Sequence, residues 1–103
     1  MAEIRQGITP TFTLTLPDTV DLTQAENVYV TFRQGSRELT KTGRDITVSA
    51  HSIDVFLSQE ETLSFERGSV RIQVNWVYAD GNRGETNIAS VEWAETLLRE
   101  VLE

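Results

Sequence analysis

The sequence contains no cysteine, one histidine and two prolines among its 103 residues. The absence of cysteine excludes disulfide bonds, thiolate zinc sites and cysteine nucleophiles. Because transition metals in proteins are held mainly by histidine and cysteine, one histidine alone is a poor basis for such a site. We therefore expect neither a metal nor a cofactor.

Basic residues are also scarce, since nine Lys and Arg stand against sixteen Asp and Glu and give a net charge of −7. The cations are scattered along the chain, whereas binding to a phosphate backbone requires clustered cations. We therefore expect no nucleic-acid partner. The acidity is typical of a soluble, self-repelling surface, and it would also match a basic partner surface.

Long apolar runs are missing. The longest one covers residues 76–79, far fewer than the roughly 20 residues that a helix needs to cross a bilayer. The first residues show no basic segment followed by an apolar stretch, as a secretory signal would. We expect no membrane partner, and a chain that is in the cytoplasm when it is synthesised.

What the sequence does contain is ordinary globular composition, with 39% hydrophobic and 24% charged residues, of a size suited to a single domain over residues 1–103. Apolar and polar residues alternate through most of it, the pattern of strands that bury one face. Such strands are expected near residues 8–16, 28–33, 37–42, 46–48, 53–57, 70–78 and 85–93. The aromatic residues with inward parity are Phe12, Phe32, Phe65, Trp76 and Tyr78.

Two segments depart from this alternation. Ser58 and Glu61 have the spacing of a capping box, which predicts a short helical turn near residues 59–64. After Trp93 the apolar residues change to helical spacing, which predicts a short C-terminal helical segment. About seven strands with turn signals between them predict an all-β, immunoglobulin-like antiparallel β-sandwich. A small barrel is the alternative fold.

No arrangement of catalytic residues stands out. His51 lies between Ala50 and Ser52 in a predicted turn, and Glu60 and Glu61 are adjacent at a helix start, which points them apart. The polar stretch at residues 80–85 resembles the start of a calcium loop, but its sixth and twelfth places lack the glycine and glutamate of an EF-hand. We expect no enzyme, and a minimal hydrolase built on carboxylates is the weakest hypothesis.

Apolar residues with outward parity point instead to protein contacts. Tyr29, Phe56 and Val77 have this parity, whereas Trp93 ends the last strand, where packing and exposure are both open. The candidate partner-interface residues are Tyr29, Phe56, Val77, Trp93, Leu97, Leu98, Val101 and Leu102. The same aromatic residues Tyr29, Phe56 or Trp93 could instead form the stacking platform of a carbohydrate- or cell-surface-binding module.

Several segments in order along the chain resemble small proteins encoded in the structural modules of prophages and tailed phages of Firmicutes. These are residues 5–17, residues 57–65, Val70-Arg71-Ile72-Gln73-Val74 and Arg99-Glu100-Val101-Leu102. The strand pattern, with Val20-Asp21-Leu22-Thr23 before a strand, also looks like the N-terminal immunoglobulin-like domain of phage baseplate upper proteins.

The resemblance implies a non-enzymatic structural or assembly protein of a phage particle, associated with its tail or baseplate. It implies other phage structural proteins, or further copies of the chain, as partners, and the virion as the location once the chain is incorporated. The family supplies no catalytic residues.

Overall fold

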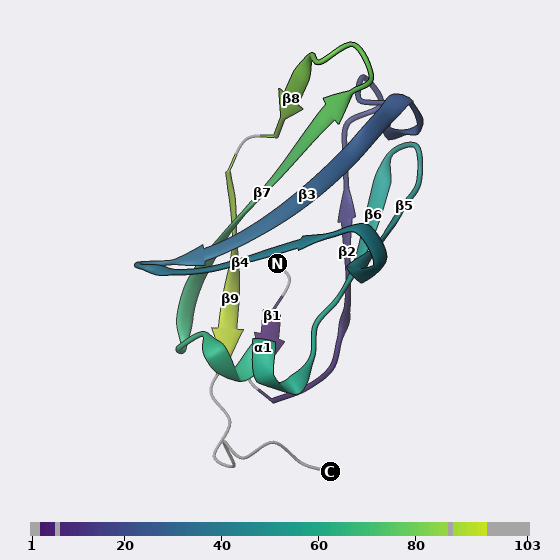
Figure 1. Ribbon diagram of the computed structural model, residues 1–103. Helices are drawn as coiled ribbons and strands as arrows, with labels where there is room; N and C mark the ends of the chain where they lie inside the picture. Colours follow the sequence, from purple (N-terminus) through teal and green to yellow (C-terminus); the bar gives the residue numbers. More distant parts are fainter. Residues whose placement is uncertain (1–2, 6, 87, 95–103) are drawn as a thin grey trace.

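The computed structural model describes residues 3–5, 7–86 and 88–94, which form two packed β-sheets with a short α-helix, α1 (Gln59–Ser64), at one end (Figure 1). The larger sheet has the order β1 (Glu3–Arg5), β9 (Ala89–Ala94), β7 (Gly68–Tyr78), β3 (Ala25–Gln34) and β4 (Arg37–Thr42), and β8 (Arg83–Glu85) also pairs with β7. The smaller sheet has the order β2 (Thr11–Thr15), β6 (Ser52–Phe56) and β5 (Ile46–Val48). Two 3-10 turns, η1 (Leu22–Gln24) and η2 (Gly43–Asp45), lie in the connections.

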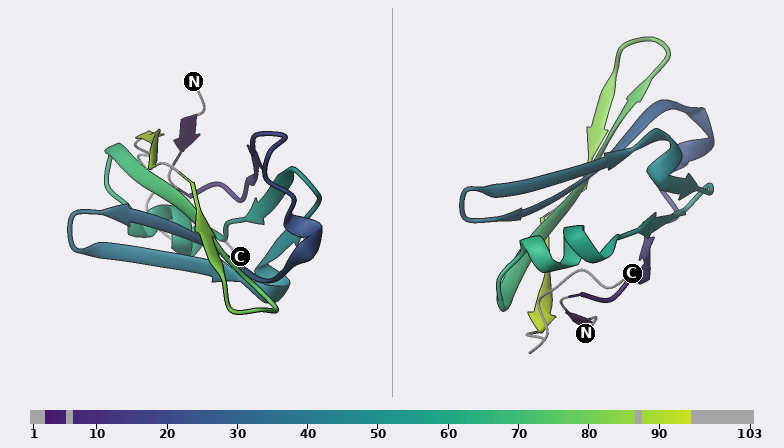
Figure 2. Two further views of the ribbon diagram at one scale, coloured as in Figure 1. Left: turned by 90° about the horizontal axis from the view of Figure 1, so that it is seen from above. Right: turned by 60° about the horizontal axis from the view of Figure 1, so that its bottom comes forward.

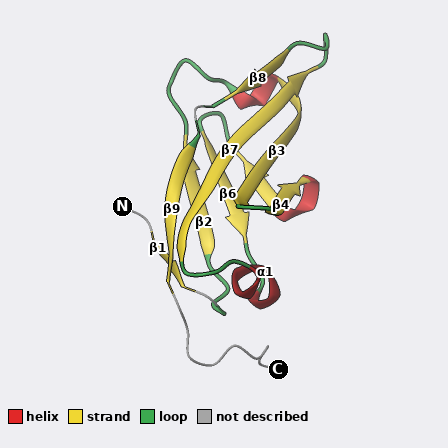
Figure 3. Ribbon diagram, turned by 90° about the vertical axis from the view of Figure 1, so that its left-hand side faces the viewer, coloured by secondary structure: helices red, strands yellow, loops and turns green. Residues whose placement is uncertain are grey.

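The strand order confirms the predicted sandwich. β9, β7, β3 and β4 are neighbours in one sheet, and β2, β6 and β5 are neighbours in the other, as the G, F, C, C′ and the B, E, D strands are in immunoglobulin-like domains. The pairs are antiparallel except β1 with β9, which is parallel. The barrel alternative is wrong, because the strands form two separate hydrogen-bonded sheets that lie face to face (Figure 3).

The core lies between the two inner faces, and the alternation predicted its members. Val30, Phe32, Val70 and Ile72 project from the larger sheet and are buried. Ile53 and Val55 project from the smaller one, and Leu57, directly after β6, is buried with them. Of the aromatic residues with inward parity, Phe32, Phe65 and Trp76 are buried, and Phe12 and Tyr78 are partly buried against the same cluster.

The N-terminal part differs from the prediction. Ile8 was expected to face the core from a strand over residues 8–16, but its side chain is 43% exposed and β2 begins only at Thr11. The reason is that β1 belongs to the larger sheet and β2 to the smaller one, so Ile8 lies in the connection between the two layers. The alternation did not predict β1.

The last strand differs as well, because it is two segments with different registers. β8 pairs with β7 at Trp76↔Gly84, whereas β9 pairs with β7 at Ile72↔Ala89, one residue out of step. An extra residue in one strand changes which side chains face inward. In β8 the even-numbered residue Gly84 faces the core, whereas in β9 the odd-numbered residues Val91 and Trp93 face it.

Candidate interaction surfaces

Tyr29 and Val77 lie together on the outer face of the larger sheet. Tyr29 is paired with Asn75, and Val77 stands two residues further along β7. Both are half-buried, and they line a shallow hollow of about 270 Å³ together with Asn75 and Arg83. Arg83 Nη2 donates to Asn75 Oδ1 over 2.8 Å, which holds the guanidinium over the sheet. The sequence therefore placed these two candidates on the correct face.

Ile88 is a surface residue that the sequence did not reveal. Its side chain is 55% exposed and lines a second hollow of about 270 Å³ on the larger sheet, with Arg33 and Arg71 among its neighbours. Continued alternation from β8 would have pointed residue 88 at the core, and the register shift turns it outward. Only the pairing of the strands shows this shift.

Phe56 lies on the outer face of the smaller sheet, as its parity predicted. Its side chain is 53% exposed, and it is paired with Thr11 of β2. The neighbouring outward residue on β6, Asp54, accepts a 2.7 Å hydrogen bond from Thr13 Oγ1. Phe56 and Tyr29 therefore belong to opposite outer faces of the sandwich.

Trp93 is a core residue, and the expectation that it contributes to a surface interface is wrong. Its side chain is 1% exposed and meets Phe65 in an edge-to-face contact with 5.1 Å between ring centroids. Its indole Nε1 donates to the backbone oxygen of Thr62 over 2.8 Å. The donor is thus satisfied inside the protein, as buried tryptophan requires.

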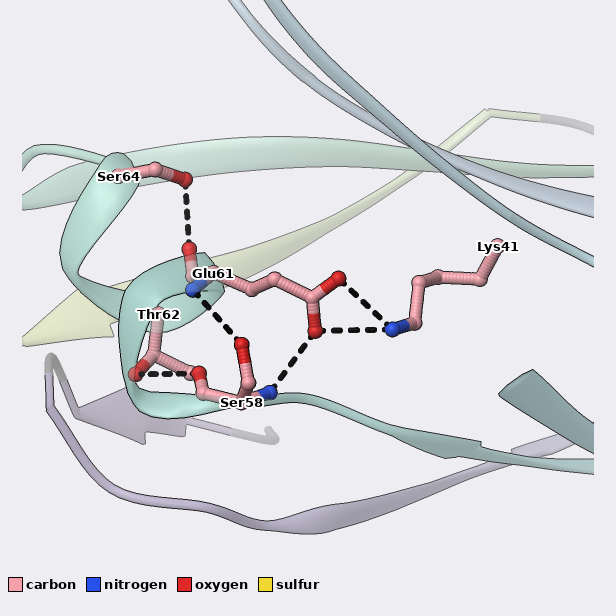
Figure 4. Close-up of polar contacts among 5 residues, drawn as sticks. All are labelled: Lys41, Ser58, Glu61, Thr62 and Ser64. Carbon is pink, nitrogen blue, oxygen red and sulfur yellow. Dashed lines mark hydrogen bonds and ion pairs between the residues drawn. The ribbon is translucent and has the colours of Figure 1, made fainter.

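The helix α1 fixes this end of the sandwich, where β9 finishes (Figure 2, right). The predicted capping box is confirmed, because Glu61 N–H donates to Ser58 Oγ and Ser58 N–H donates to the Glu61 carboxylate (Figure 4). Thr62, which is 0% exposed, accepts from Gly7 N–H and donates to Ile8 O through its hydroxyl, both at 2.9 Å. One helical turn thereby connects the β1–β2 connection to the ring of Trp93.

Lys41 and Glu61 form a partly buried ion pair between β4 and α1. Lys41 Nζ lies 2.8 Å from both carboxylate oxygens, and its side chain is only 8% exposed (Figure 4). Burial alone would raise the pKa of the Glu61 carboxyl, but hydrogen bonds from Lys41 and Ser58 and the attraction of the ammonium group together hold this pKa below its usual range. Glu61 therefore acts as a structural anion.

A hollow of about 410 Å³ separates β2 from the larger sheet, and we call it the β2 hollow. Its apolar lining residues are Leu14, Leu16, Pro17, Val20, Ile72, Val74, Trp76 and Ala89. Leu14 and Val20 are only partly buried, in contrast to the residues around α1. At this hollow the sandwich leaves part of its apolar interior accessible.

His51 and Asp80, two residues considered for chemistry, have structural partners. His51 Nδ1 lies 2.6 Å from the Val20 carbonyl oxygen in the predicted turn. In the loop between β7 and β8, Asp80 accepts from the backbone N–H of Asn82 and closes a tight turn. Within residues 3–5, 7–86 and 88–94, no group of three His, Cys, Asp or Glu side chains is placed to hold a metal ion.

The remaining four candidates, Leu97, Leu98, Val101 and Leu102, and the predicted C-terminal helical segment lie outside the described residues.

Searches with protein-family models and against curated proteins gave no match for this chain. Among the helices of the described residues, none combines the length and the apolar character needed to span a bilayer.

Proposed function

We propose that this chain is a non-enzymatic structural or assembly protein of a phage or prophage particle, associated with its tail or baseplate, and that it acts by packing against other proteins or further copies of itself. The observation that carries the packing mechanism is the side of the molecule around β2. There β2 is an edge strand, Leu14 of β2 lines the β2 hollow, and the exposed Phe56 of the neighbouring β6 is paired with Thr11. Accessible apolar groups beside an open strand edge favour a protein partner.

The assignment to a phage particle is supported by the sequence resemblance described above. The packing mechanism fits that assignment, because a chain in a particle is held by contacts on several sides. Here the outer face of the larger sheet with Tyr29 and the outer face of the smaller sheet with Phe56 offer two separate sides.

The experiment uses a host that carries the gene and releases particles. Purified particles are analysed by mass spectrometry for the chain, and particles from a deletion strain are examined by electron microscopy. We expect the chain in the particles at a fixed ratio to the tail proteins, and absent or malformed tails without it. Complementation with a chain lacking residues 95–103 should restore assembly poorly. Normal, infective particles that lack the chain would contradict the proposal.

A carbohydrate-binding module is the second candidate, and the hollow beside Tyr29 is the feature that favours it. An aromatic ring next to Asn75 and Arg83 offers a stacking surface with hydrogen-bonding groups. A glycan array with the full chain tests this directly, with Tyr29→Ala as the site variant and Phe56→Ala as the matched control on the opposite face. Binding lost only in Tyr29→Ala would favour the module, and an array without signal would dismiss it.

A further inference from the structure

The edge strands of the two sheets differ in how they are protected against pairing with another chain. Sheet edges are normally protected by shortness or by charge. β1, β5 and β8 have three residues each, and β4 carries Arg37, Glu38 and Lys41. β2 has five residues and no charge, and it lies in residues 6–17, the longest stretch of the sequence without a charged side chain. Within the described part of the chain, β2 is therefore the long unprotected edge.

The backbone of β2 presents its free hydrogen-bonding groups at the threonines. Leu16 N–H donates to His51 O over 2.8 Å, and Leu57 N–H donates to Pro10 O over 3.2 Å. In an antiparallel strand the N–H and C=O groups of successive residues alternate between the two sides. The even-numbered residues of β2 thus bond to β6, and Thr11, Thr13 and Thr15 direct their N–H and C=O groups to the open side.

We propose that two copies of this chain pair through β2, antiparallel and across a two-fold axis at Thr13, so that their smaller sheets join into one continuous sheet. This inference rests on the proposed function in so far as that function acts by packing between proteins. The inference makes the proposed function more specific, because it names the strand, β2, and the partner, a second copy of the same chain.

The side chains of β2 are complementary to themselves in this register. Thr13 faces Thr13 of the second copy, and Thr11 faces its Thr15, so the outer face carries only threonine pairs. On the inner face, Phe12 stands opposite Leu14 of the second copy. Such aromatic–aliphatic and Thr–Thr pairs stabilise antiparallel sheets. No charges meet along the strand, although each copy has a net charge of −7.

The β2 hollow gives the pairing an apolar component. In the single chain, Leu14 lines this hollow and is only partly buried. The ring of Phe12 from the second copy would lie beside Leu14 at the open side of the hollow and would shield Leu14 from water. The ladder ends after Thr15, because Pro17 is the next odd-numbered residue and has no N–H to donate. A two-fold contact that uses the same strand twice closes at a dimer.

Cysteine cross-linking tests the two-fold axis, because the chain has no cysteine of its own. Thr13 and Thr47 are both exposed threonines that pair with Asp54, one on β2 and the other on β5. In the proposed pairing, the two copies of residue 13 have Cα atoms about 5.5 Å apart, within the range of a disulfide. We expect Thr13→Cys to form a disulfide-linked dimer under mild oxidation, and Thr47→Cys to remain monomeric on a non-reducing gel. Equal cross-linking of the two variants would overturn the two-fold pairing.

A change of charge at the same two positions tests the association without a covalent bond. Light-scattering mass is measured for the full chain from micromolar to millimolar concentration, and thermal melting confirms that each variant is folded. We expect a dimer for the unsubstituted chain and for Thr47→Lys. Thr13→Lys places two ammonium groups face to face and should shift the dimer to monomer by at least tenfold in concentration. A monomer at every concentration, a trimer, or equal loss in both variants would overturn the proposal.

Failure of this inference and failure of the proposed function remain distinguishable. If the chain is found in particles but is monomeric in solution and does not cross-link through residue 13, the self-pairing of β2 is wrong and the particle role stands. If the dimer forms and cross-links as expected but particles lack the chain, the self-pairing stands and the particle role is wrong.

Discussion

The end of the sandwich at α1 and the side at the β2 hollow are built from the same alternating strands, but they are closed to different degrees. At α1, Thr62, Phe65 and Trp93 are each at most 1% exposed, and the polar groups of Thr62 and Trp93 are hydrogen-bonded. At the β2 hollow, the apolar lining of Leu14 and Val20 is only partly buried. A single helical turn makes the difference, because it supplies both a cover and hydrogen-bonding partners.

This contrast separates residues that hold the fold from residues that are available for association. Burial and satisfied polar groups at α1 leave little there for a partner to gain. At β2, backbone groups on the open side and the partly exposed Leu14 are available to a second chain. Hydrogen bonding to these groups and burial of Leu14 would stabilise its association. Substitutions should therefore lower the free energy of unfolding more at α1 than at β2.

The largest effect is expected at Trp93. Trp93→Ala removes a buried ring and its hydrogen bond to Thr62 and should lower the free energy of unfolding by about 3–5 kcal/mol. Urea denaturation followed by circular dichroism measures this. Trp93→Phe keeps a ring but not the N–H donor, so its loss should be smaller. An Ala variant as stable as the parent chain would contradict the placement of Trp93 in the core.

A matched pair of leucines tests the comparison itself. Leu57 precedes α1 and is 3% exposed, whereas Leu14 lines the β2 hollow and is partly buried. Leu57→Ala should lower the free energy of unfolding by about 2–5 kcal/mol, and Leu14→Ala by less than half as much. The two variants are compared in the same urea titration. Equal losses would show that the β2 side is as tightly packed as the helix end.

Gly84 should matter because of its neighbour Trp76. A Cβ atom at this position would overlap Trp76 Cε2 and Nε1, so the indole would have to move. Gly84→Ala should lower the free energy of unfolding by about 1–3 kcal/mol and shift the fluorescence of Trp76, measured with Trp93→Phe as background. In a Trp76→Leu background the same change should be much less harmful, since the clash is gone. Additive losses in the double variant would contradict this contact.

The smallest effect is a pH dependence from Glu61. Because its pKa is lowered in the folded chain, the ionised carboxylate stabilises the fold above its unfolded pKa of about 4.3. That contribution disappears as the pH falls through the lower folded value. The stability difference between the parent and Glu61→Gln should be about 1 kcal/mol larger at pH 7 than at pH 3.

Glu60→Gln is the control for this measurement, because Glu60 is exposed and adjacent to Glu61. The same change of charge there should leave the difference from the parent nearly constant with pH. A Glu60 variant that follows the Glu61 variant would assign the effect to the charge of the helix start and not to the ion pair with Lys41.

Local patterns predicted much of the fold. The alternation of Val70, Ile72, Val74 and Trp76 placed these residues inside, and the spacing of Ser58 and Glu61 predicted the start of α1. Outward parity also placed Tyr29 and Phe56 on outer faces. These features depend on residues close together in the chain, so the sequence contains what is needed to infer them.

Other features were missed because they depend on contacts between distant segments. Lys41 is buried only because α1 brings Glu61 to it, and Ile8 is exposed only because the chain crosses between layers there. Trp93 shows the limit most clearly. Its position at the end of the last strand was compatible with packing and with exposure, and the neighbouring α1 decided for packing.

The sequence by itself determined which residues of each strand share a face, where turns occur, and that β2 carries no charge. The tertiary structure alone decided which strands are edges, that the return strand changes register before Ile88, and which side of the sandwich α1 covers. The physical reason is the range of the interactions: side-chain alternation and helix capping act over a few residues, whereas pairing and burial depend on residues far apart in the chain.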